Sequence, residues 1–271
     1  MGFYPSQLPP SMRRFFWRWS YEWMARLWQR ADWQLMNYGF EPTDSDPGGR
    51  PELRETDEPD RSCIQLYHRV ASQRPLSDLR VVEVGSGRGG GAAYVHRYLG
   101  PATTVGVDLS EAAVDLASRI HEQPGLSFQA GDAEDLPLDD QSTDIVLNVE
   151  SSHCYGRMEQ FLAEVHRVLA PGGYLLLTDL RLHSRVTDLD ATIADSDLEL
   201  EERVDITEGV VRGLRVDSAR REKLIRETAG WWLRGPLGAF AAVEGSSTFR
   251  DLDSRHFVYL CYALRRPVES S

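Results

Sequence analysis

The sequence predicts an α/β fold built around a mostly parallel sheet, and three observations support this class. Between residues 62 and 182, short apolar segments alternate with helical segments, as they do in consecutive βαβ units. A glycine-rich turn follows the first apolar segment and spells G-x-G-x-x-G with Gly85, Gly87 and Gly90. Acidic residues end the second and third apolar segments. Ligands bind at the carboxyl ends of strands in open α/β sheets, so a ligand site is expected at that edge.

The individual elements follow from the pattern of apolar and turn residues. Five strands are expected in this region, at residues 79–85, 103–109, 126–132, 143–150 and 173–180. Ser110 is expected to cap a helix over residues 110–123, and Pro171 and Gly172 to close a helix over residues 158–173. Near the end of the chain, residues 255–266 alternate in polarity and predict one more strand that flanks the sheet.

Composition narrows the class of protein. The 271 residues include 30 basic and 42 acidic side chains, and no Lys or Arg stripe appears, which argues against a nucleic-acid partner. The three cysteines lie far apart, so neither a disulfide framework nor a zinc site is expected, and no cluster has metal-ligand spacing. No run of about 18 apolar residues and no signal-peptide pattern is present. A cytoplasmic protein is therefore expected.

The first 42 residues carry five of the seven tryptophans, with arginines interleaved. This pattern predicts amphipathic helices packed on the core. It also fits an acceptor tunnel or a peripheral contact with an anionic membrane surface, and these readings stay open.

The residue two positions before the glycine loop bears on which ligand the loop holds. Glu83 would place a carboxylate beside a pyrophosphate, a like-charge contact that disfavours NAD. The same carboxylate suits a cationic ligand without phosphate, such as S-adenosylmethionine. Asp108 lies at about the spacing (roughly 20 residues after the first glycine) expected for an acid that binds ribose hydroxyls. That acid fits any adenosine ligand and does not separate the two cofactors.

Further segments extend the pattern over about 100 residues. The stretches "QAGDAEDLPLDDQSTDIVLNVES" and "LAPGGYLLLTD" resemble the class I S-adenosylmethionine-dependent methyltransferases. "DEPDRSCIQLYHRVA" and "LNVESSHCY" look like the actinobacterial small-molecule O-methyltransferases, namely the phthiotriol/phenolphthiotriol dimycocerosate and fatty-acid group, and are similar to natural-product sugar O-methyltransferases. The resemblance implies a Rossmann-like sheet ordered 3-2-1-4-5-7-6 with the last strand antiparallel.

The resemblance also implies how the chain is divided. The expected parts are N-terminal cap helices (1–42), a linker (43–61), the cofactor-binding core (62–182), a cap insertion with helices (183–255) and a C-terminal strand (256–271). The cap would close over a hydrophobic small-molecule acceptor. The oligomeric state stays open, a homodimer among the options.

Residues that the resemblance implies for the cofactor fall into groups along the chain. Gly85, Ser86 and Gly87 would contact its methionine and ribose parts, and Glu83 is expected to face its positive charge. The remaining candidates are Asp108 and Leu109 at the ribose and adenine, Asp132 and Ala133 at the adenine, Asn148, Val149 and Glu150 at the cleft end, Tyr38 and Gly39 near the cofactor, and Gln65 at the methionine carboxylate.

Two further residues are candidates for catalysis. Transfer to a hydroxyl needs a base of near-neutral pKa, usually a histidine. His153 follows the fourth strand and Asp179 ends the fifth, and their separation matches the base and partner of the sugar O-methyltransferases. We expect His153 to take the proton, and Asp179 to orient it or bind the acceptor. A structural histidine and a loop-capping aspartate are the alternatives.

Other functions remain in competition with O-methylation. C-methylation and a non-methylating cyclase on the same fold stay open, since cofactor binding would look the same. An NAD-dependent oxidoreductase is a distant alternative, because no Tyr-x-x-x-Lys pair occurs and Lys223 is the only lysine in the chain.

Overall fold

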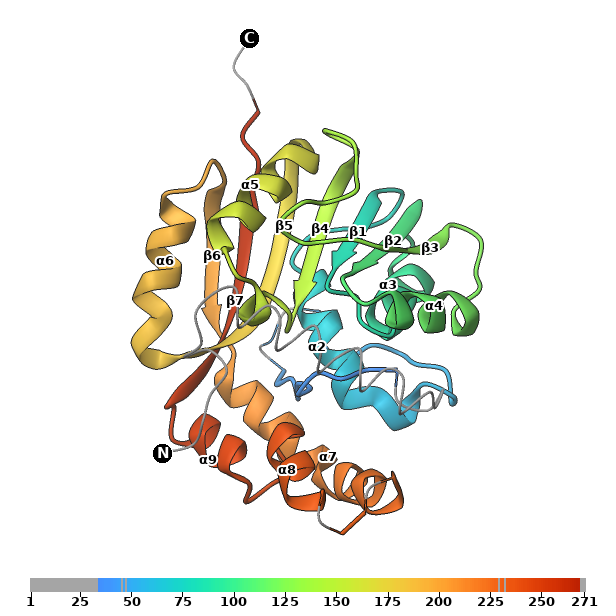
Figure 1. Ribbon diagram of the computed structural model, residues 1–271, viewed down its shortest axis with the longest axis vertical. Coiled ribbons are helices and arrows are strands. Elements are labelled where there is room, and N and C mark those ends of the chain that lie inside the picture. The colour runs from blue at the N-terminus through green and yellow to red at the C-terminus, as the bar shows by residue number, and fades with distance from the viewer. Residues whose placement is uncertain (1–33, 45, 47, 229, 232, 269–271) are drawn as a thin grey trace.

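The protein is seen here in a computed structural model that describes residues 34–44, 46, 48–228, 230–231 and 233–268. In this part of the chain seven strands form one sheet in the order β3-β2-β1-β4-β5-β7-β6 (Figure 1). Strands β1 to β5 pair in parallel, and β7 is antiparallel to both of its neighbours. The bounds are β1 (Arg80–Val84), β2 (Thr103–Asp108), β3 (Leu126–Ala130), β4 (Thr143–Val149), β5 (Leu169–Leu182), β6 (Glu199–Asp205) and β7 (Phe257–Arg265). The predicted fold class and strand order are confirmed.

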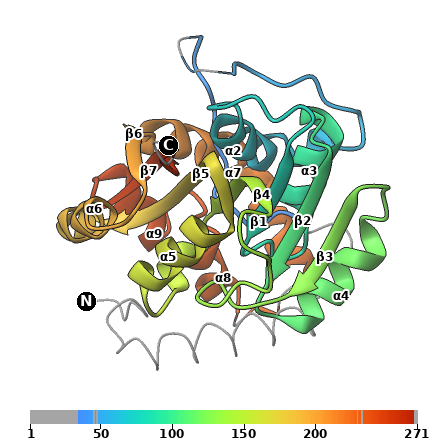
Figure 2. The ribbon, with the colours of Figure 1, turned by 90° about the horizontal axis from the view of Figure 1, so that it is seen from above.

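Helices cover both faces of the sheet (Figure 2). One apolar cluster joins inward residues of α2 (Arg61–Ala71), α3 (Gly90–Leu99), α7 (Thr207–Thr228) and α9 (Ser247–Asp253) to one face. A second cluster joins α5 (Met158–Val168) and α6 (Val186–Ala194) to the other face. The remaining helices are α4 (Glu111–Ile120) and α8 (Arg234–Phe240), and short 3₁₀ turns lie at η2 (Glu58–Asp60), η3 (Ser152–Cys154) and η4 (His183–Arg185).

Period-two alternation in the strands decides which side chain meets which cluster. In β7, Tyr259 and Cys261 belong to the first cluster, whereas Leu260 and Tyr262 belong to the second. The strand is therefore buried on both faces, and its sequence is apolar almost throughout.

Two predicted helix boundaries can be compared with the structure. The hydroxyl of Ser110 accepts a hydrogen bond from the backbone N–H of Ala113 at 3.3 Å, which confirms the predicted N-cap of α4. The predicted end of α5 at residue 173 is wrong, because the helix ends at Val168 and Leu169 already pairs with Thr143 of β4. Leu169 is fully buried, so the strand gains core packing by starting early.

The stretch after β5 divides between the sheet and a separate helical group. Its first part supplies α6 and the edge strand β6, which is formed by an acidic run of the sequence. The helices α7, α8 and α9 lie together at the carboxyl ends of the parallel strands (Figure 1). Residues 34–42, called the strap below, run without helix, although cap helices were expected over residues 1–42; residues 1–33 of that part lie outside the described residues. No helix in the described ranges is long and apolar enough to cross a bilayer.

Candidate active site

The glycine loop turns back sharply at the end of β1. Gly85 has a φ of +78°, and a Cβ there would lie 2.3 Å from the hydroxyl of Ser151, so no larger residue fits. The backbone N–H groups of Gly85 and Ser86 donate to the carbonyl of Val107 at 2.8 and 3.1 Å. The loop is thereby fastened to the end of β2, and its remaining surface faces a cavity.

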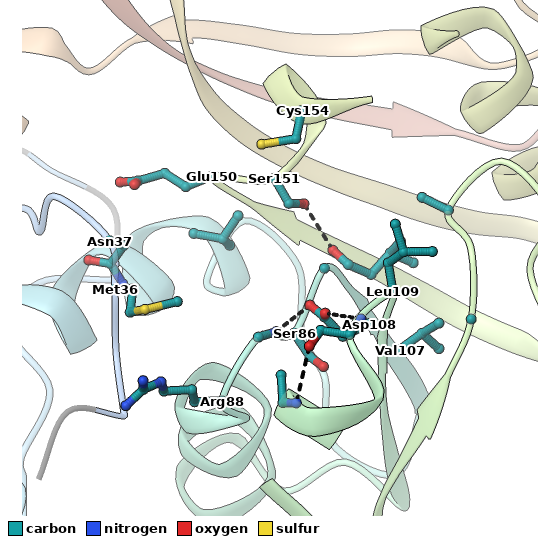
Figure 3. A pocket seen from close by; sticks show the side chains of 18 of the residues that line it. Met36, Asn37, Ser86, Arg88, Val107, Asp108, Leu109, Glu150, Ser151 and Cys154 are labelled. Atoms are coloured by element: carbon teal, nitrogen blue, oxygen red, sulfur yellow. Dashed lines mark hydrogen bonds between the residues drawn. The ribbon is translucent and has the colours of Figure 1, made fainter. Parts of the chain in front are cut away.

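The cavity has a volume of about 170 Å³, which is more than ten times the roughly 15 Å³ that one water needs. It lies among the glycine loop, the ends of β2, β3 and β4, and the strap (Figure 3). The predicted residues on its wall are Gly85, Ser86, Gly87, Asp108, Leu109, Asp132, Ala133, Val149 and Glu150. Sequence reasoning missed other wall residues, among them Met36 and Asn37 of the strap, Tyr67, Arg88, Ser151, Cys154 and Tyr155.

Asp108 is held at the end of β2 by backbone donors. Its Oδ2 accepts from the N–H of Gly87 at 2.7 Å, and its Oδ1 from the N–H of Ser110 at 2.9 Å. Burial raises the pKa of Asp108, and these two hydrogen bonds counteract the rise. Each carboxylate oxygen retains capacity for a second donor, as binding of ribose hydroxyls would require.

Glu83 does not lie on the wall of the cavity, contrary to its expected contact with a ligand charge. It is fully buried behind the loop, where the hydroxyl of Tyr67 donates to its Oε1 at 2.6 Å. Burial raises the pKa of Glu83 to about 8, against the opposing effect of this hydrogen bond. Glu83 lies off the cavity wall because successive side chains of a strand point to opposite faces of the sheet, and that of residue 83 points toward α2.

Four further predicted cofactor residues, Tyr38, Gly39, Gln65 and Asn148, also lie off this wall and support the structure around it. The side-chain amide of Gln65 donates to the carbonyl of Phe40 at 2.7 Å, so this donor serves the strap. Asn148 donates to the carbonyl of Val84 at 3.0 Å and links β4 to β1. Gly39 has a φ of +77° and turns the strap beside α2.

The strap is fixed from three directions. The side-chain amide of Asn37 donates to the carbonyl of Cys63 in α2 at 3.1 Å, and the backbone carbonyl of Asn37 accepts from Arg221 in α7 at 3.1 Å. The N–H of Tyr38 donates to Oε1 of Glu150 at 2.6 Å. The side chain of Tyr38 lines a second, smaller cavity that lies between the strap, α7 and α8.

His153 and Asp179 meet as the sequence predicted, because β4 and β5 are neighbours. Nδ1 of His153 lies 2.8 Å from Oδ1 of Asp179, and the N–H of His153 donates to Oδ2 at 2.7 Å. Asp179 is 3% exposed and also accepts from Ser152 at 2.7 Å and pairs with Arg181 at 3.0 Å. Arg181 was missed, although it follows Asp179 by two positions on the same strand.

The protonation states of this pair are strongly linked. Burial opposes a charge on His153, but the carboxylate of Asp179 outweighs it and raises the pKa of His153 well above its usual value. Burial likewise opposes the charge on Asp179, yet His153 and Arg181 lower its pKa. The pair is a carboxylate holding an imidazole of raised basicity, with Nε2 as the nitrogen that would receive a proton.

The wall of the larger cavity limits which group it can hold. Four acidic side chains, Asp108, Asp132, Glu134 and Glu150, line it with one guanidinium, that of Arg88. This balance disfavours a pyrophosphate and suits an adenosine ligand that carries positive charge. A Cβ on Gly87 would project into open space, with Met36 the nearest contact at 3.9 Å, so a glycine there leaves room for a ligand. Among the described residues, no group of three His, Cys, Asp or Glu side chains is arranged to hold a metal.

Comparison with known proteins agrees with this geometry. The family model "Methyltransferase domain" matches residues 82–177. The chain is 38% identical over 94% of both chains to the phthiotriol/phenolphthiotriol dimycocerosates methyltransferase of Mycobacterium leprae. It is 38% identical to the fatty-acid O-methyltransferase of Mycolicibacterium smegmatis, covering 92% of this chain and 89% of that one.

A solved structure extends the likeness to the fold. The geranyl diphosphate C-methyltransferase of Streptomyces coelicolor matches with a TM-score of 0.65 at 20% identity, covering 94% of this chain and 97% of that one. A sequence relative that is 38% identical covers 94% of the chain, and the glycine loop and the acid at the end of β2 agree with this match. The chain therefore belongs to the class I S-adenosylmethionine-dependent methyltransferases.

Proposed function

We propose that the enzyme transfers a methyl group from S-adenosylmethionine to a hydroxyl oxygen of a hydrophobic, lipid-like or polyketide-like small molecule. The observation that carries the proposal is the contact between His153 and the buried carboxylate of Asp179. An alcohol must lose its proton on methylation, and an oriented histidine is suited to accept it. The two mycobacterial relatives, whose names refer to lipid substrates, support the choice of acceptor class.

The larger cavity is the proposed cofactor site. Gly85, Ser86 and Gly87 would hold the methionine and ribose parts, and Asp108 would accept hydrogen bonds from the ribose hydroxyls. Leu109, Asp132 and Ala133 would hold the adenine, since they lie on the same wall. When bound, the cofactor supplies a methyl group made electrophilic by its sulfonium.

In the proposed reaction, His153 and Asp179 manage the proton of the acceptor. Nε2 of His153 would take the hydroxyl proton while the methyl carbon exchanges its bond to sulfur, which keeps the electron pair, for a bond to the acceptor oxygen. The proton would later leave to solvent. Asp179 holds Nδ1, which fixes the ring and stabilises the imidazolium that forms. Arg181 and Ser152 in turn hold Asp179 ionised and in place.

The second cavity is the proposed place for the apolar part of the acceptor. The strap residues Leu35, Met36 and Asn37 line both cavities and form a wall between them. The other residues around the second cavity are Tyr38, Cys63, Arg220, Arg221, Leu224, Ile225, Thr228, Leu237, Phe240 and Ala241. Most of these are apolar, and both guanidiniums are paired with Asp217, which favours an uncharged ligand segment.

The test uses S-adenosylmethionine with an isotope-labelled methyl group and a panel of fatty acids, diols, aglycones and glycosides. Mass spectrometry detects the gain of one labelled methyl, and NMR of the product shows whether that methyl sits on oxygen or carbon. A labelled methyl ether supports the proposal, whereas a methyl ester as the only product would contradict the role of the base, because the carboxyl group of a fatty acid is already ionised near neutral pH. A labelled C-methyl would replace it by C-methylation, which the same base would also serve. Binding of the cofactor without any methylated product would favour a non-methylating role.

A further inference from the structure

Glu150 has an unusual position at the end of β4. It adopts a left-handed backbone conformation with a φ of +50°, which residues other than glycine rarely take. Its N–H still donates to the carbonyl of Thr178 in β5 at 2.9 Å, so the strand pairing continues to this residue. A strained backbone at a strand end is often associated with a functional side chain.

The two carboxylate oxygens of Glu150 have different surroundings. Oε1 accepts both from the N–H of Tyr38 in the strap and from the hydroxyl of Tyr259 in β7. Oε2 has no hydrogen bond from any described residue, and Glu150 lies on the wall of the cofactor cavity (Figure 3). The side chain is thus held firmly by one oxygen while the other is available to a ligand.

The burial of Glu150 makes its ionised form costly without a ligand. Burial raises the pKa of Glu150 to about 7, the donors on Oε1 counteract the rise, and the negative charge of Asp179 adds to it. His153 offsets part of this effect. A positive charge placed beside Oε2 would stabilise the ionised carboxylate.

We propose that Oε2 of Glu150 binds the positively charged part of the cofactor, either its sulfonium or its α-ammonium group. This rests on the proposed function only in taking the larger cavity as the cofactor site. The sequence favoured Glu83 for this role, but Glu83 is buried behind the loop. Glu150 supplies the carboxylate on the cavity side, held by contacts from the strap and from β7.

The test is calorimetric titration of the purified protein with S-adenosylmethionine, S-adenosylhomocysteine and methylthioadenosine. Glu150→Gln keeps an oxygen that can accept from Tyr38 and Tyr259 but removes the charge. Loss of a charge-assisted contact is expected to weaken binding roughly ten- to hundredfold. If the contact is to the sulfonium, only S-adenosylmethionine loses affinity. If it is to the ammonium, S-adenosylhomocysteine loses as much, while methylthioadenosine, which lacks both groups, is unaffected.

Two control variants separate this role from a structural one. Tyr259→Phe removes one donor to Oε1 but keeps the carboxylate, so it should weaken S-adenosylmethionine binding much less than Glu150→Gln. Glu150→Ala removes both the charge and the link to the strap. The proposal is overturned if Glu150→Gln binds all three ligands like the parent protein, and weaker binding by Glu150→Ala alone would then indicate a structural role. Equal weakening of all three ligands by Glu150→Gln, with a lower Tm, would likewise overturn it by indicating a distorted cavity.

If the parent protein binds the cofactor but methylates no hydroxyl compound, the proposed function fails while this test remains valid. If the parent protein binds none of the three ligands, the assignment of the cavity fails with it.

Discussion

Replacing Asp179 by Asn tests the proposed proton transfer most fully, because it changes charge with little change of shape. The carboxylate is buried and receives hydrogen bonds from Ser152 and from both Nδ1 and the N–H of His153, at 2.7–2.8 Å. Asn cannot stabilise the imidazolium by charge, a loss of about 1.5–3 kcal/mol for one such hydrogen bond. That loss corresponds to a fall in kcat/KM of roughly ten- to hundredfold, less than the about 10²–10⁴-fold that general base catalysis as a whole contributes.

The pH dependence of the same variant gives a second, independent readout. In the parent enzyme, Asp179 overcomes the effect of burial and raises the pKa of His153. The base is active only when neutral, so the rate should increase with pH through this raised pKa, on the alkaline side of the ordinary histidine value. Without the carboxylate, the largest cause that opposes burial is lost, so the pKa of His153 falls relative to the parent enzyme and the rate increases at a lower pH.

The assay is the initial rate of product formation by mass spectrometry across the neutral and alkaline range, with saturating cofactor. Ser152→Ala is the matched control, because it removes one donor to Asp179 but keeps the charge and the contact to His153. Ser152→Ala should leave the pH at which the rate increases nearly unchanged. A role for Asp179 in proton transfer is excluded if Asp179→Asn keeps the rate of the parent enzyme, or if its rate increases at the same pH.

Three more changes test other parts of the structure. The raised pKa of Glu83 keeps its carboxyl protonated in the folded state, so the stability of the parent protein should fall by a few kcal/mol as pH rises from the unfolded pKa near 4.5 through about 8. The Tm of Glu83→Gln relative to that of the parent should therefore rise with pH. A difference in Tm that does not change with pH would contradict this. Gly87→Ala and the control Gly100→Ala each place a Cβ on a left-handed residue and should cost about 1–2 kcal/mol, but calorimetry should find weaker cofactor binding only for Gly87→Ala. Ser110→Ala removes the cap of α4 and should lower unfolding free energy by about 1 kcal/mol in a denaturant titration, without changing cofactor affinity.

Much of the fold could be predicted because its signals are local. The strand and turn patterns between residues 62 and 182 each lie within a few residues, and the cap at Ser110 is a single side chain. The contact between His153 and Asp179 could also be anticipated, because parallel neighbours end at the same edge of the sheet. His153 follows β4, and Asp179 lies near the end of β5, so the two side chains meet there.

The rest depends on contacts that a local pattern does not encode. The donors to Glu150 come from Tyr38 and Tyr259, which lie 112 and 109 residues away in the chain. Glu83 was expected on the cavity side, but the strand alternation and the position of α2 bury it. The edge strand β6 was not predicted, because most of its residues are exposed and acidic and show no apolar pattern of a strand.

In the proposed reaction, His153 removes a proton from an acceptor hydroxyl during methyl transfer. The most direct measurement compares the parent enzyme with His153→Ala, each incubated with label-bearing S-adenosylmethionine and the best hydroxyl acceptor of the panel. We predict an O-methylated product from the parent enzyme, its loss by at least about 10²-fold in the variant, and equal cofactor binding by both. Undiminished O-methylation by His153→Ala would contradict the account.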